Sequence, residues 1–145
     1  MVQQTRDEMP RIVPMIAYED AAAAIDWLAR AFGFRERGER YTEPDGRVSH
    51  AEMEFDGGQI SLATPTRDYQ GPRHHRETCV AARKWSSVPW VIDGLLVHVD
   101  DVDAHFARAK AAGATMLSKV EDQPYGKLYR AEDLEGHRWM FLQPK

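Results

Sequence analysis

The sequence IVPMIAYEDAAAAIDWLARAFG at residues 12–33 has a counterpart, LLVHVDDVDAHFARAKAAG, at residues 95–113. Each copy is an apolar run, an acidic residue, about three turns of alanine-rich helix and a glycine. A short carboxylate accepts the free N–H groups of a first helical turn, and glycine adopts the left-handed conformation that ends a helix. The repeat therefore predicts two helices, N-capped by Asp20 and Asp101 and stopped at Gly33 and Gly113.

Strand-forming segments follow each predicted helix. In the first half they are residues 34–41, 48–55 and 59–63, and in the second half residues 115–120, 128–132 and 138–142. The order is β-α-β-β-β in both halves, and the two predicted caps lie 81 residues apart. The sequence thus predicts an α+β fold built from two similar modules.

We expect a single domain at residues 1–145, with a first module at about 11–64, a linker at 65–90 and a second module at about 91–143. The linker contains several prolines and is predicted to be irregular. It carries five cationic side chains against two acidic ones. It is therefore either an attractor of an anionic ligand or a solvated connector.

Composition excludes several classes of function. Hydrophobic residues make up 43% and charged residues 29% of the chain, as in globular proteins. The net charge of −4, with no long basic run, argues against nucleic acid as a partner. No apolar run is long enough to cross a membrane, and residues 1–9 lack the apolar segment of a signal peptide. Cys79 is the only cysteine, so we expect a cytoplasmic protein.

The paired modules resemble the glyoxalase/bleomycin-resistance/dioxygenase superfamily, also called the vicinal oxygen chelate superfamily. The likeness spans residues 11–143 and includes VDDVDA at 99–104, AGA at 112–114, DLEGHRW at 133–139, HAE at 50–52 and GGQI at 57–60. It implies a curved, mixed sheet of eight strands around a cavity, with the helices outside.

The resemblance also implies four positions at which metal-dependent members bind a divalent ion. Here these positions fall on Val13, Ser61, Gly94 and Met140. Divalent ions bind imidazole and carboxylate groups, which none of the four provides, and a shift of one residue adds only Asp93. We therefore expect no metal and no other cofactor, and no catalytic residue is assigned.

Polar side chains alternate along residues 48–55. His50, Glu52 and Glu54 share one face of this strand, opposite Met53 and Phe55. They are acid/base or ligand-anchoring groups, a displaced metal site, or the solvated face of a half-buried strand. His98, on the same face as Gly94 in its own strand, either contacts a ligand or is a hydrogen-bonded strand-end histidine.

Aromatic rings are the other candidate contacts. Trp85 and Trp90 lie at the end of the linker, and Tyr129 lies in the hairpin that the resemblance places over the cavity. Flat rings suit a planar ligand, although these rings could instead anchor the linker and hairpin to the core. The predicted ligand-binding residues are His50, Glu52, Ser61, Trp85, Trp90, His98, Tyr129 and Met140.

The leading hypothesis is a metal-independent protein that sequesters an aromatic or drug-like small molecule, as the drug-binding branch of the superfamily does. We expect a homodimer, because a curved sheet with exposed edges needs a partner surface. The alternative is a lyase, isomerase or dioxygenase that uses a displaced metal site or acid–base chemistry at His50 and Glu52. A third reading is an interaction module with a vestigial cavity.

Overall fold

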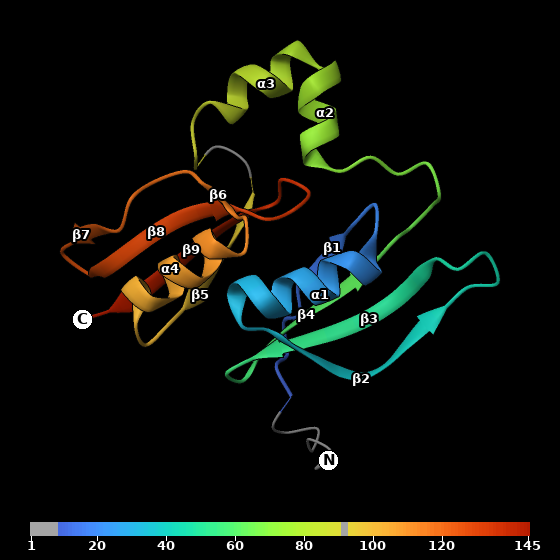
Figure 1. The fold of residues 1–145 in the computed structure, drawn as a ribbon, viewed down its shortest axis with the longest axis horizontal. Coiled ribbons are helices and arrows are strands. Elements are labelled where there is room, and N and C mark those ends of the chain that lie inside the picture. Colours follow the sequence, from blue (N-terminus) through green and yellow to red (C-terminus); the bar gives the residue numbers. More distant parts are fainter. Residues whose placement is uncertain (1–8, 91–92) are drawn as a thin grey trace. The chain divides into compact units, whose positions relative to one another are not determined.

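The structure is a computed structural model that describes residues 9–90 and 93–145 (Figure 1). The chain divides into two compact units, and each is described by itself. The first unit contains residues up to 29 and residues 33–69, and the second contains residues 30–32 and 70–145. Within the described part of the chain, no helix is long and apolar enough to cross a membrane.

The first unit contains a four-stranded mixed sheet in the order β1-β4-β3-β2. Its strands are β1 (Met15–Ala17), β2 (Arg35–Thr42), β3 (Val48–Phe55) and β4 (Gly58–Ala63). β1 runs parallel to β4, and the other pairs are antiparallel. β1 begins only after Pro14, which has no N–H to donate to a strand ladder.

Helix α1 (Ala21–Phe32) begins and ends where the sequence predicts. The Asp20 side chain accepts a hydrogen bond of 3.0 Å from the Ala23 N–H, and Gly33 has a φ of +83°. The inward side of α1 and one face of the sheet supply the buried apolar residues of this unit, which include Ile25, Leu28, Ala51, Met53, Ile60 and Leu62. The helix therefore covers one face of the sheet and leaves the other face open (Figure 1).

The second unit repeats this topology, which confirms an α+β fold of two βαβββ modules. Its elements are β5 (Gly94–His98), α4 (Val102–Ala111), β6 (Thr115–Met116), β7 (Glu121–Gln123), β8 (Gly126–Glu132) and β9 (Arg138–Pro144). The order is β5-β9-β8-β6, β7 also pairs with β8, and β5 runs parallel to β9. The Asp101 side chain caps α4 by accepting from the Ala104 N–H.

The strand predicted at residues 115–120 is instead split into β6 and β7. The reason is local, because the hydroxyl of Ser118, rather than a backbone carbonyl, accepts the Arg130 N–H at 3.0 Å. The ladder therefore breaks between the two short strands. The described residues form nine strands in two separate sheets, where the sequence predicts eight in one.

The linker is not irregular, and this prediction was wrong. It contains α2 (Pro72–Thr78) and α3 (Val80–Ser86). Pro72 stands in the first turn of α2, where its fixed φ favours a helix and its missing N–H costs nothing. The Arg73 guanidinium donates hydrogen bonds of 2.7 and 3.0 Å to the carbonyls of Leu134 and Asp133, which hold α2 against the β8–β9 turn.

A histidine lies in the aromatic core of the second unit. His105 Nδ1 is 2.6 Å from the Tyr129 hydroxyl, and His105 Nε2 is 2.9 Å from the Phe32 carbonyl. The imidazole also packs against the Phe141 ring, with 4.2 Å between centroids. Burial lowers the pKa of His105 below its ordinary value of 6.5 and raises the pKa of Tyr129.

We expect His105 to make folding stability depend on pH. The unfolded chain binds a proton on this side chain near pH 6.5, whereas the folded protein resists protonation there. The contribution is thus complete above pH 6.5 and is lost as the pH falls toward the lowered folded pKa, by up to about 1.4 kcal/mol per pH unit. The free energy of unfolding, measured with urea at pH 7.5, 6.5 and 5.5, should fall less steeply with falling pH for His105→Gln than for the wild type. His75→Gln, at an exposed position, serves as control. An equal pH dependence of the unfolding free energy in His105→Gln and the wild type would contradict the expectation.

Candidate functional site

The open face of the second sheet brings three strands together at Met140. Met140 on β9 pairs with Leu96 on β5 on one side and with Arg130 on β8 on the other. Side chains on paired positions point to the same face of a sheet. Phe141 and Tyr129, one residue further along, point to the opposite face and are fully buried.

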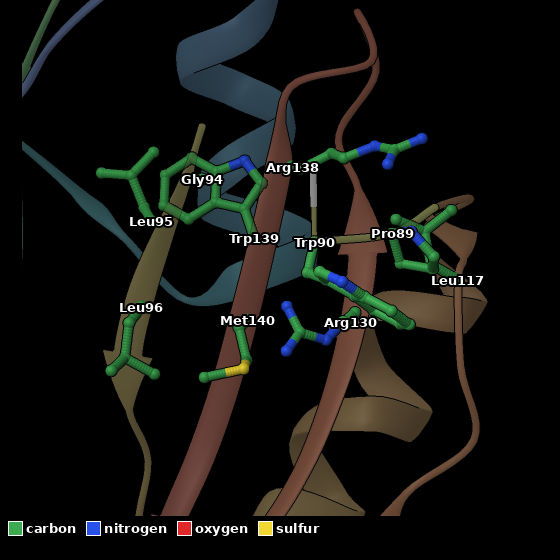
Figure 2. A pocket seen from close by; sticks show the side chains of 10 residues that line it. All are labelled: Pro89, Trp90, Gly94, Leu95, Leu96, Leu117, Arg130, Arg138, Trp139 and Met140. Atoms are coloured by element: carbon green, nitrogen blue, oxygen red, sulfur yellow. The ribbon is translucent and has the colours of Figure 1, made fainter. Parts of the chain in front are cut away.

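A pocket with a volume of about 180 Å³ lies on this open face. Figure 2 shows Leu96, Met140 and Arg130 on neighbouring strands, with the Trp90 indole beside Arg130. The complete lining is Pro89, Trp90, Gly94, Leu95, Leu96, Leu117, Arg130, Arg138, Trp139 and Met140. The lining residues are therefore apolar apart from two arginines, Arg130 and Arg138.

The two arginines of the pocket differ in their partners. Arg138 is only 5% exposed, and its Nε donates to Glu132 at 3.0 Å, while its other nitrogens donate to the carbonyls of Ser86 and Val88. Glu132 also accepts from Arg76 at 3.0 Å. The guanidinium of Arg130 has no acceptor or ion-pair partner among the residues that the structure describes.

The open face of the first sheet carries a different, charged set. His50 lies between Ser61, with 3.5 Å from Nδ1 to Oγ, and Glu52, with 3.6 Å from Nε2 to Oε1. Glu52 in turn lies 3.5 Å from the Arg37 guanidinium. The structure thus brings the predicted residues His50, Glu52 and Ser61 together. Their side chains are half exposed, and the distances are longer than those of a tight hydrogen bond.

The metal-ligand positions implied by the resemblance need a correction of two residues. Met15, not Val13, pairs with Ser61, and Leu96, not Gly94, pairs with Met140. Neither thioether nor isobutyl groups replace water around a hard divalent ion, so the corrected positions do not fit one either. Over residues 9–90 and 93–145, no group of three or more His, Cys, Asp and Glu side chains could hold a metal.

Other predicted contacts lie elsewhere. Tyr129 is 0% exposed, and its ring points to the core with its hydroxyl on His105, so the prediction that it contacts a ligand is corrected. Trp85 is exposed on α3 and does not line the pocket. His98 shares the open face with Leu96 but lies outside the pocket lining.

Sequence reasoning missed Arg130, Leu96 and Leu117. Arg130 carried a usable signal, because the turn at residues 133–137 fixes the β8–β9 register and places Arg130 opposite Met140. Leu96 carried one because it lies two residues after Gly94, on the same face of its strand. Leu117 carried none, since it reaches the pocket from the break between β6 and β7.

Repeated βαβββ modules, each with α-helices on one face of a mixed sheet, define the class of fold. The chain belongs to the Glyoxalase/Bleomycin resistance protein/Dioxygenase superfamily, whose model matches residues 11–141.

Two relatives share about a third of the sequence. The uncharacterized protein Rv0887c of Mycobacterium tuberculosis is 34% identical over 98% of this chain and 82% of its own length. The crystal structure of TioX from Micromonospora sp. ML1 is 33% identical, with a TM-score of 0.65, and covers 94% of this chain and 97% of its own. The structure of TnmS3, an antibiotic binding protein from Streptomyces sp. CB03234, is 20% identical, with a TM-score of 0.59, and covers 94% and 98%. At 20% sequence identity, the likeness to TnmS3 shows the shared fold alone.

We expect the purified protein to carry no stoichiometric divalent metal. Met15, Ser61, Leu96 and Met140 provide no charged oxygen or imidazole nitrogen to replace the hydration shell of a cation. Elemental analysis after dialysis without chelator checks this directly. Thermal melts with nickel, zinc, manganese and iron(II) should show no shift. One tightly held metal per chain, lost in His50→Ala or His98→Ala, would contradict it.

Proposed function

We propose that this chain binds an aromatic or drug-like small molecule on the open face of its second unit, without a metal. The observation that carries this proposal is the pocket beside Trp90, whose walls are apolar apart from Arg130 and Arg138. Ligand sites are typically concave and apolar, with a few polar groups that orient the ligand. The antibiotic binding protein TnmS3 has the same fold, which supports the proposal.

The size of the pocket indicates how such a ligand is bound. Sites for drug-sized ligands have volumes of about 300–1,000 Å³. The pocket volume of about 180 Å³ accommodates one ring system. Trp90 is 69% exposed and Leu96 is 54% exposed, so both present apolar surface next to the pocket. A larger ligand would insert one ring beside Met140 and lie along these two side chains.

A second candidate function is acid–base catalysis at His50. The imidazole lies between a hydroxyl and a carboxylate, an order that is found where histidine activates a nucleophile. Distances of 3.5 and 3.6 Å exceed the 2.6–3.2 Å expected for such contacts, and Glu52 is shared with Arg37. We therefore favour binding over catalysis, and over an interaction module without a ligand.

We also propose that the protein is a cytoplasmic homodimer. The strands β1 and β5 are the edges of their sheets in the described part of the chain, and each exposes an apolar side chain, Met15 or Leu96. Exposed edges and apolar patches favour association. The single free cysteine, Cys79, is consistent with a reducing compartment.

Ligand binding should change tryptophan fluorescence through Trp90. We expect at least one compound in a panel of aromatic and polycyclic antibiotics to quench the emission in a saturable way. Trp90→Ala should weaken its affinity about tenfold, which corresponds to about 1.4 kcal/mol. Trp85→Ala is the matched control, because Trp85 is also exposed but lies outside the pocket. Equal losses in both variants, or a loss only in His50→Gln, would place the ligand elsewhere.

The oligomeric state can be measured independently. Light scattering at micromolar concentration should give about twice the monomer mass of 16.6 kDa. Met15→Glu should shift the equilibrium toward monomer, because it places a charge on an exposed apolar edge. A monomer at all concentrations would rule out the homodimer.

A further inference from the structure

We propose that the ligand of the second unit is an aromatic anion, whose carboxylate or sulfonate binds to Arg130 while its ring packs against Trp90 and Met140. This inference rests on the proposed function and specifies its ligand class. It follows from the charges around the pocket rather than from its shape.

Arg130 is the pocket cation whose charge the described residues do not compensate. It is half-buried, and it stands between Met140 on β9 and Leu117, with Trp90 nearby. None of these neighbours can accept a hydrogen bond from a guanidinium through its side chain. A cation among apolar groups gains most from an anion that arrives with its own apolar surface, because the pair is then shielded from water.

The other pocket arginine cannot play this part. Arg138 has its charge balanced by Glu132, and its remaining nitrogens are bound to the carbonyls of Ser86 and Val88. An anion at Arg138 would have to displace Glu132, which is also paired with Arg76. Binding at Arg130 displaces no described partner.

Two arginines of the basic linker are already bound to backbone carbonyls. The guanidinium of Arg73 is bound to the carbonyls of Leu134 and Asp133, and that of Arg83 to the carbonyls of Arg76 and Glu77. These two cations hold α2 and α3 in place. For Arg73 and Arg83, the connector reading of the linker therefore agrees better with the contacts than the reading as an attractor of an anionic ligand.

The open face of the first sheet provides a contrast within the same chain. Its cations are paired with carboxylates, since Arg35 lies 3.1 Å from Glu54 and Arg37 lies 3.5 Å from Glu52. Among the described residues of that face, the charges of Arg35 and Arg37 are thus already balanced by carboxylates. The preference for an anion should accordingly reside in the second unit.

The backbone holds Arg130 in a defined position. Its N–H donates to the Ser118 hydroxyl at 3.0 Å, and its carbonyl accepts from the Leu117 N–H at 2.9 Å. A planar guanidinium binds a carboxylate or sulfonate through two parallel hydrogen bonds. Because Arg130 and Trp90 line one small pocket, the anionic group must be attached directly, or within a bond or two, to the ring.

Two fluorescent probes with nearly the same ring system test this assignment. The first, 8-anilinonaphthalene-1-sulfonate, is anionic, and the second, N-phenyl-1-naphthylamine, is the uncharged parent. We expect the wild type to bind the sulfonate about tenfold more tightly. Arg130→Gln should abolish this preference and leave the affinity for the uncharged probe within about twofold. Trp90→Ala should weaken the binding of both probes.

Controls separate charge from folding. Arg35→Gln removes one positive charge from the first unit and should leave both affinities unchanged. Arg130→Lys keeps the charge but loses the paired hydrogen bonds, so it should retain part of the preference. Thermal melts establish whether each variant is folded. If Arg130→Gln does not fold, Arg130→Lys is used for the test instead.

The outcomes distinguish this inference from the function on which it rests. If neither probe binds and no antibiotic does, the proposed function fails. If both probes bind with equal affinity, small-molecule binding stands and the anionic class is overturned. If the sulfonate preference survives in Arg130→Gln, the anion is bound by another cation and the assignment to Arg130 is wrong.

Discussion

Glu132 is the carboxylate on which the arrangement of the second unit depends. It is buried and lies 3.0 Å from both Arg76 of α2 and Arg138 of β9. Removing one partner from a buried ion pair leaves an uncompensated charge at a cost of about 3–5 kcal/mol. Arg138 in turn donates to the carbonyls of Ser86 and Val88, immediately before Pro89 and Trp90 enter the pocket wall. A structural ion pair and the position of a pocket-lining ring are thus connected.

Elements that follow from local rules could be predicted from the sequence. Asp20 and Asp101 cap their helices through hydrogen bonds to residues only three positions later in the sequence. The alternation of residues 48–55 places Met53 in the core. The helices of the linker do not follow from its proline content, because proline disfavours a helix interior but is tolerated in a first turn, where Pro72 lies. What holds them, the bond from Arg73 to Leu134, spans 61 positions and has no local signature.

The candidate site was predicted in part, and its errors follow from strand geometry. Tyr129 and Arg130 are neighbours in sequence, yet one is in the core and the other faces the pocket, because a strand alternates its side chains. The chemistry of Tyr129 suits a ligand, but it does not determine which face of the strand the ring occupies. Gly94 and Leu96 are two residues apart and therefore share a face of β5. Leu117 depends on a strand break that Ser118 creates.

The division of each sheet into a helix-covered face and an open face has an evolutionary consequence. Mutations at Leu96, Arg130 or Met140 alter the open face, while the aromatic core residues of the unit, such as Phe141, lie on the other side. Selection for specificity and selection for core packing therefore act on alternating positions of the same strands. A chain of this kind can acquire a new ligand by small steps without first passing through a poorly folded intermediate.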